Sequence, residues 1–203
     1  MKKKKLRKKR LYLILFIVIL CLGGGYYFYN HIYMRNTIEK YTVEGLPIEH
    51  QFLTVNPYSR SGKQLKRVKG IVIHYVANPG STAQNNRDYF ESLKNKHTSY
   101  ASSHFVIGLE GEIIQCIPLN EISYASNQRN KDTISIECCH PDKSGKFNGE
   151  TYQSLQELVS SLMKTYHLNK NDIIRHYDVT GKNCPKYFVD HEDDWELFKN
   201  SLQ

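Results

Sequence analysis

The stretch Arg175-His-Tyr-Asp-Val-Thr-Gly-Lys-Asn-Cys-Pro185 places a histidine, a lysine and a cysteine within eleven residues. His176 follows the apolar pair Ile173-Ile174, and the turn-prone run Thr180-Gly-Lys-Asn183 brings the chain around before Cys184. A short loop of this kind lets the imidazole and the thiolate face the same ion. The stretch therefore predicts two ligands of one metal site.

A third ligand is available far upstream, in the apolar and strand-like run Ile71-Val-Ile-His-Tyr-Val76, where the histidine is His74. Two imidazoles and one thiolate are typical of a catalytic zinc site, whose fourth tetrahedral position is left for water. A deprotonated Cys184 offsets one charge of Zn²⁺, so the site stays positive and lowers the pKa of bound water toward about 7. Taken singly, each of these residues is better explained as ordinary core or surface. Their combination predicts a hydrolase that binds one Zn²⁺ per chain.

Four sequence segments carry a resemblance to a known family, over about residues 70–187. They are the His74 strand, Ser103-His-Phe105 followed by Glu110-Gly-Glu112, Thr133-Ile-Ser-Ile-Glu137, and the His176 to Cys184 loop. Together they resemble the zinc-dependent N-acetylmuramoyl-L-alanine amidases, a family that includes the T7 lysozyme-type amidases and is similar to the peptidoglycan recognition proteins. The resemblance implies cleavage of the amide bond between the lactyl group of muramic acid and the L-alanine of the stem peptide.

The resemblance also implies roles for five residues. His74, His176 and Cys184 match the family's zinc ligands, and Lys182 matches a lysine that stabilises charge growing on the carbonyl oxygen. Glu137 matches an acidic residue that takes a proton from water and passes it to the leaving amine.

One position departs from part of the family, which has a tyrosine immediately before the histidine that matches His104. Here that position is Ser103, whose hydroxyl is too short to replace a phenol. This departure strengthens the assignment of Glu137 as the residue that transfers the proton. His104 itself is expected to be a structural strand histidine and not a ligand.

The catalytic roles are also reasonable without the family, because amide hydrolysis needs a proton shuttle and a cation or donor beside the oxyanion. Glu137 ends the segment Ile134-Ser-Ile136, where alternation puts its carboxylate on the face opposite the isoleucines. The alternatives are a solvated strand-end glutamate and, for Lys182, a solvated lysine in a turn.

Apolar periodicity indicates an α/β fold in which a central mixed β-sheet is flanked by helices. Thr82 or Ser81 can cap the first helix, a leucine-rich stripe marks the second, and Leu109-Glu-Gly-Glu112 between two apolar runs predicts a hairpin. The expected strands are 70–76, 104–109, 112–117, 133–138 and 172–175, and the expected helices are 82–94, 151–166 and 193–202.

Charge is concentrated at the N-terminus. Residues 1–10 hold eight of the 28 lysines and arginines, which leaves 20 basic against 20 acidic residues in the remainder of the chain. A formally neutral domain lacks the excess positive charge that binds a phosphate backbone, so we expect no nucleic-acid partner. Residues 1–10 are expected to be a cytoplasmic basic tail.

Leu11 to Leu22 is an unbroken apolar run, and Gly23 to Tyr29, which ends in aromatic residues, extends it to 19 residues. As a helix it would reach about 28 Å, close to the roughly 30 Å of a bilayer's hydrocarbon core. Basic residues before it and aromatic residues after it predict an uncleaved single-pass anchor in a bacterial cell membrane, with the N-terminus cytoplasmic and the catalytic domain facing the cell wall. A cleaved signal is the main alternative, although no Ala-x-Ala-like site follows. Leu20 before Cys21 argues against lipoprotein processing.

The remainder divides into residues 30–53, expected to be a stalk or an N-terminal arm that packs on the domain over about Tyr41 to Phe52, and a catalytic domain at 54–203. Two other functions stay open. One is a non-catalytic peptidoglycan-binding module of the same fold. The other is a membrane-tethered interaction protein with structural zinc, for which Asp178 is the best fourth ligand. A Cys116 to Cys138 disulfide is also open, provided that the two strands adjoin.

Overall fold

The computed structural model describes residues 23–26 and 45–202. Contacts divide the chain into two units, Met1–Thr42 and Val43–Gln203, and the sheet lies in the second. Residues 23–26 are helical, but the basic tail at 1–10 and most of the expected anchor at 11–29 lie outside the described residues. None of the described helices combines the length and the apolar character that crossing a bilayer requires.

Six strands form one mixed sheet in the order β1-β4-β3-β5-β2-β6. The β3–β4 pair is antiparallel and every other neighbouring pair is parallel. The predicted α/β class with a mixed sheet is therefore confirmed. The strands are β1 (Ile48–His50), β2 (Ile71–Tyr75), β3 (Phe105–Ile107), β4 (Ile113–Gln115), β5 (Ile134–Cys138) and β6 (Ile173–Arg175).

The register of the central strands separates the two faces of the sheet. His74 of β2 pairs with Glu137 of β5, which in turn pairs with Val106 of β3. Because successive side chains of a strand point to opposite faces, these three residues share one face. Ile73 and Ile136, which are fully buried, belong to the other face. The same two strands thus direct His74 and Glu137 to one face, and Ile73 and Ile136 to the other.

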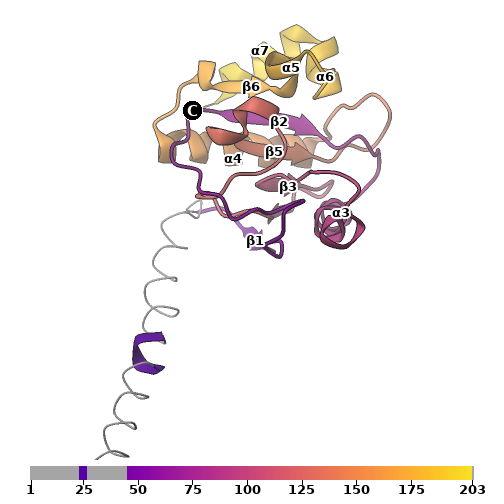
Figure 1. Ribbon diagram of the computed structural model, residues 1–203. Coiled ribbons are helices and arrows are strands. Elements are labelled where there is room, and N and C mark those ends of the chain that lie inside the picture. Colours follow the sequence, from indigo (N-terminus) through magenta and orange to yellow (C-terminus); the bar gives the residue numbers. More distant parts are fainter. Residues whose placement is uncertain (1–22, 27–44, 203) are drawn as a thin grey trace, which may run out of the picture. The chain divides into compact units, whose positions relative to one another are not determined.

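Helices cover the sheet where its strands are apolar. α3 (Ala83–Lys96) begins at the cap Thr82, and its Ala83 and Phe90 pack in a cluster with Val106 and Ile114. α4 (Gly149–Tyr166) lies behind the sheet in Figure 1. The stripe predicted for this helix is completely buried and consists of Leu155, Leu158, Val159 and Leu162.

Three short helices follow β6 and gather beyond that edge of the sheet (Figure 1). They are α5 (His176–Thr180), α6 (Lys186–Asp190) and α7 (Glu192–Ser201). Two 3-10 turns, η2 (Asn127–Lys131) and η3 (Lys170–Asp172), precede β5 and β6. Of these five elements only α7 was expected, because elements of three to five residues are too short to show a hydrophobic period.

The segment expected to be a stalk or arm contributes to the sheet. β1 pairs in parallel with β4, and Leu53, which follows it, is 1% exposed. Thr54 is held against α3, because its hydroxyl donates to the carboxylate of Glu91 over 2.6 Å. The sheet-bearing unit therefore begins before the expected boundary at residue 54.

The Cys116 to Cys138 disulfide, left open by the sequence, does not form. Cys116 follows β4 and Cys138 ends β5, and β3 lies between these two strands. The proviso that the strands adjoin is therefore not met. The four cysteines of the described region are all buried free thiols.

Candidate active site

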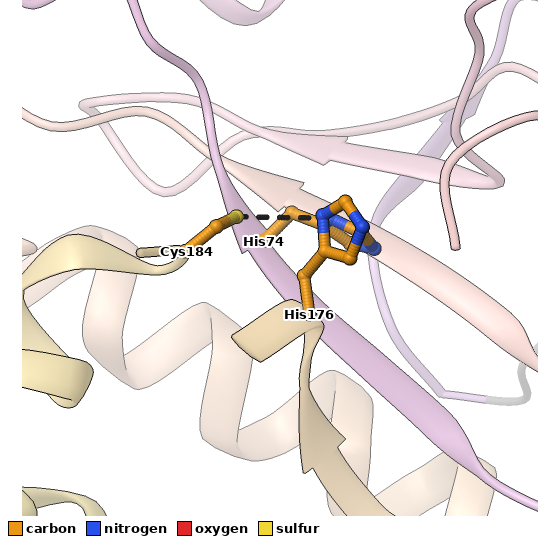
Figure 2. A group of neighbouring side chains, drawn as sticks. All are labelled: His74, His176 and Cys184. Carbon is orange, nitrogen blue, oxygen red and sulfur yellow. Dashed lines mark hydrogen bonds between the residues drawn. The ribbon is translucent and has the colours of Figure 1, made fainter. Parts of the chain in front are cut away.

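Three residues from separate parts of the chain meet near the C-terminal end of β2. His74 comes from β2, His176 is the first residue of α5, and Cys184 lies in the loop before α6. Figure 2 shows the three side chains converging, and their ligand atoms all lie within 4.8 Å of one another. All three residues are buried. The structure thus brings together the three expected metal ligands.

The loop that carries Cys184 is folded back on α5 by backbone hydrogen bonds. Gly181, at a φ of +76°, ends α5 in the left-handed conformation, in which its N–H donates to the carbonyl of Tyr177. The N–H of Tyr177 in turn donates to the carbonyl of Cys184 over 2.9 Å. Because Tyr177 is next to His176 in the chain, these bonds hold the thiol beside the imidazole.

Arg175, the residue before α5, is held at the start of this helix by hydrogen bonds. It is 5% exposed, and its guanidinium donates to the Asp178 carboxylate over 2.9 Å and to the carbonyl of Phe188 over 2.9 Å. Asp178 also accepts the backbone N–H of Arg175. The carboxylate that was the best candidate for a fourth ligand is thus engaged with Arg175. Within the described part of the chain, the cluster with metal-ligand spacing contains three residues and not Asp178.

The donor set and its spacing fit zinc. Sγ of Cys184 lies 3.8 Å from Nδ1 of His74. With Zn–S near 2.3 Å and Zn–N near 2.0–2.1 Å, tetrahedral sulfur and nitrogen donors are separated by about 3.6 Å. The rings of His74 and His176 are tilted by 59°, with centroids 4.7 Å apart, so neither covers the other's face. A soft thiolate with two imidazoles is a typical zinc set.

Burial holds the three groups uncharged when no cation is bound. It lowers the pKa of His74 well below the usual range, and His176 and Lys182 lower this pKa further. The pKa of His176 is lowered mainly by burial and then by Lys182. Burial also raises the pKa of the Cys184 thiol to about 12, with a further contribution from Glu137. A metal ion that binds here must therefore displace the thiol proton.

Glu137 lies beside the cluster as the direct cross-strand neighbour of His74. Its Oε2 atom is buried without a hydrogen-bond partner. Burial raises the pKa of this carboxyl to about 8, against an opposing effect of Lys182. Burying a carboxyl oxygen without a hydrogen-bond partner costs folding free energy. A group of this kind beside a cluster of metal-binding residues is therefore a candidate catalytic residue. Lys182 itself is exposed, and its charge acts on the pKa of Glu137 and of all three cluster residues.

His104 has a different setting from the cluster histidines. It is completely buried, its Nδ1 accepts the N–H of Ser135 over 3.0 Å, and its Nε2 lies 3.0 Å from the carbonyl of Glu121. Burial lowers its pKa to about 4. Both ring nitrogens are used within the fold, so His104 has no free donor for a metal. Ser103 also points inward and donates to the carbonyl of Ser135.

Two residues of the site were not expected from the sequence. Ser126 Oγ lies 3.1 Å from Nε2 of His74, and Asn127 Oδ1 lies 3.0 Å from Nε2 of His176. Both residues belong to the turn that opens η2, which has no apolar period. A Ser-Asn pair in a loop has many uses, so the sequence contains no signal that singles out this one.

The fold and the His-His-Cys cluster define a class: an α/β domain with a buried three-donor site at the end of a central parallel strand. The chain matches the family model described as N-acetylmuramoyl-L-alanine amidase over residues 64–187. It therefore belongs to that family, which confirms the resemblance noted in the sequence.

Individual relatives agree with this assignment. The N-acetylmuramoyl-L-alanine amidase CwlL of Bacillus licheniformis is 38% identical over 165 residues, which cover 74% of this chain and 45% of that protein. BlyA of Bacillus subtilis (strain 168), named as the same kind of amidase, is 33% identical over 175 residues, or 76% and 46% of the two chains. The chain thus spans about half the length of these curated relatives.

Solved structures share the fold. A mutant endolysin from Bacillus subtilis superimposes with a TM-score of 0.65 at 27% identity, covering 78% of this chain and 99% of that one. The catalytic domain of XlyA superimposes with a TM-score of 0.65 at 25% identity and covers 78% and 100%. The folded unit of this chain therefore corresponds to almost the whole of these two domains.

Proposed function

We propose that this chain is a zinc-dependent N-acetylmuramoyl-L-alanine amidase that hydrolyses the bond between muramic acid and the L-alanine of the stem peptide. The observation that carries the proposal is the buried His74-His176-Cys184 cluster beside the unpartnered carboxyl of Glu137. The names of CwlL and BlyA support the substrate class. Peptidoglycan is therefore the proposed substrate.

The chain's own residues supply the remaining chemistry. Bound zinc would supply a Lewis acid and make a water molecule acidic enough to attack at neutral pH. Glu137 accepts the proton that the attacking water loses and delivers it to the nitrogen of the breaking C–N bond. The products are the lactyl carboxylate and a stem peptide with a free L-alanine amine. Lys182 stabilises the negative charge that develops on the carbonyl oxygen.

The electrostatics of Glu137 agree with this role. A carboxyl with a pKa near 8 binds a proton well enough to collect it from water and releases it readily to an amine. The positive charge of a nearby dication favours the ionised form that must act first as the base. Removal of the carboxyl should therefore remove most of the turnover without removing a ligand.

The test uses the full-length chain in detergent with purified peptidoglycan, and the measurement is the release of stem peptides with new L-alanine amines. We expect release that stops with a chelator and returns with Zn²⁺. Glu137→Ala should keep bound zinc and lose most of the turnover. Wall binding without release by a folded, zinc-loaded chain would instead establish the non-catalytic binding module. Full activity of the Glu137→Ala variant would place the proton shuttle elsewhere.

We also propose that residues 11–29 anchor the chain in a bacterial cell membrane as a single span, with the N-terminus cytoplasmic and the amidase domain facing the wall. The support is the apolar run, its basic N-terminal flank and its tyrosines. The test compares the full chain with a chain lacking residues 1–29 after membrane sedimentation. We expect the truncated chain to be soluble and active. Persistent membrane association of that chain would overturn the proposal.

A further inference from the structure

Two consecutive residues contact the outer nitrogens of both cluster histidines. Ser126 Oγ lies 3.1 Å from Nε2 of His74, and Asn127 Oδ1 lies 3.0 Å from Nε2 of His176. In each ring the contacted atom is Nε2. The other nitrogen of His74, Nδ1, faces the sulfur of Cys184. One turn of chain therefore contacts both rings, and in His74 the contact lies on the nitrogen that does not face Cys184.

The chemistry of these partners determines where the ring protons lie. An amide oxygen only accepts hydrogen bonds, so Nε2 of a neutral His176 must carry its hydrogen toward Asn127. Ser126 can accept in the same way from His74. A neutral imidazole has one N–H, and the lone pair is then on Nδ1. Because only a nitrogen with a free lone pair can bind a cation, the tautomer decides whether the site can be loaded.

We propose that Ser126 and Asn127 are positioning residues that fix His74 and His176 as Nε2–H tautomers, and so direct both Nδ1 lone pairs toward the ion. The inference rests on the proposed zinc site. Its general basis is that a hydrogen bond to the outer nitrogen orients a metal-binding histidine and raises its basicity. Neither residue touches the reacting atoms.

The backbone conformation of the turn leaves the side chains of Ser126 and Asn127 available to contact the histidines. Ser126 stands at the N-cap of η2, yet its side chain makes no capping bond and is directed to His74 instead. The Asn130 side chain holds the backbone just before η2, accepting the N–H groups of Ala125 and Ser126 over 3.1 and 2.6 Å. Asn127 has a φ of +52°, in the left-handed region that asparagine tolerates better than most residues. Both side chains are thereby free to serve the histidines.

A different residue of the turn, Gln128, holds the turn against α5. Structural support of the turn can therefore be tested separately from the positioning of the histidine rings. Gln128 donates from its side-chain amide to the carbonyl of Val179 over 3.0 Å and contacts neither histidine ring through any hydrogen bond of the described residues. A variant at Gln128 therefore perturbs the same turn without changing the partner of a ring nitrogen. This residue is the matched control.

The first measurement uses the metal-free, full-length chain labelled with ¹⁵N, and long-range ¹H–¹⁵N spectra report the tautomer of each imidazole. We expect His74 and His176 to be Nε2–H before any metal is added. Ser126→Ala should release His74 alone, and Asn127→Gly should release His176 alone, giving mixtures of tautomers. Glycine is chosen because it adopts the left-handed φ without strain. An Nδ1–H tautomer of either ring in the unmodified chain overturns the proposal.

The second measurement is the affinity for Zn²⁺ by competition with a chelator of known affinity. Ser126→Ala and Asn127→Gly should each weaken binding by roughly 10- to 100-fold. Asn127→Asp, which retains an acceptor oxygen, should restore binding to within about threefold, and Gln128→Ala should stay within the same range. Equal loss in the Gln128→Ala variant, or no loss in the other two, refutes positioning. If the unmodified chain binds no zinc, the proposed function fails, while the tautomer spectra still decide this inference.

Discussion

The raised pKa of Glu137 predicts that this carboxyl's contribution to the stability of the metal-free chain falls as the pH rises toward 8. Burial raises this pKa from 4.5 to about 8, so above pH 4.5 the folded chain retains a proton that the unfolded chain releases. Stability is then present below the unfolded pKa and falls by at most about 1.4 kcal/mol per pH unit until the carboxyl ionises in the folded state. Between pH 6 and 7.5 this gives an upper limit of about 2 kcal/mol. Partial exposure of the residue reduces it, and we expect about 1 kcal/mol.

The assay is urea unfolding in the presence of a chelator, with the wild-type chain and the Glu137→Gln variant compared at each pH. The variant mimics the protonated carboxyl and cannot ionise, so titrations shared by the two chains, including those of the histidines, cancel in the difference. The stability of the wild type relative to the variant should decrease as the pH rises. Glu110→Gln, at an exposed glutamate, is the control and should give a difference that does not depend on pH. A flat difference for Glu137→Gln, or one of opposite sign, would refute the burial argument.

Three other substitutions test separate parts of the site and core. Cys184→Ser should weaken zinc binding in equilibrium dialysis, because a hydroxyl does not replace the thiolate; unchanged zinc content would remove Cys184 from the ligand set. Lys182→Ala should lower kcat on peptidoglycan by roughly 10²- to 10³-fold with little change in bound zinc, whereas Lys143→Ala, at an exposed lysine, should be neutral. Leu158→Ala, in the fully buried stripe of α4, should cost about 2–5 kcal/mol in denaturant unfolding, and a loss below 1 kcal/mol would contradict its place in the core.

The central strands and long helices of this fold are readable from the sequence because each has its own period. Ile71 to Tyr75 is an almost unbroken apolar run, as expected for a strand covered on both faces. The stripe that includes Leu155 and Leu162 repeats at helical spacing within the 18-residue α4. Expected and observed ends of these elements differ by at most two residues, since caps and fraying are set by local hydrogen bonds.

Elements that depend on tertiary contacts were not predictable. β1 consists of three residues and exists because its backbone pairs with β4. α5 has only five residues, and its start is defined by the bonds between Arg175 and Asp178. In both cases the stabilising partner is supplied by the fold and not by a pattern within the segment.

In the site, too, residues with a distinctive chemical type were predictable from the sequence, and residues whose role depends on a neighbour in space were not. His74, His176 and Cys184 could be identified because their residue types are distinctive and a family resemblance aligned them. Ser126 and Asn127 could not, because serine and asparagine are ordinary turn residues whose role depends on which nitrogen lies opposite. Sequence reasoning therefore identified the donors and missed the groups that orient them.

The arrangement of β2 and β5 explains how a polar site is built without weakening the core. Along each strand one face carries Ile73 or Ile136, which are fully buried, while the next residue presents His74 or Glu137 to the other face. Apolar burial on the first face stabilises the strands whether or not a cation is present. The cost of desolvating the polar groups is limited because burial keeps all of them in uncharged forms. The fold can therefore hold the donors in place in advance of the ion, which is the preorganisation that a hydrolytic metal centre requires.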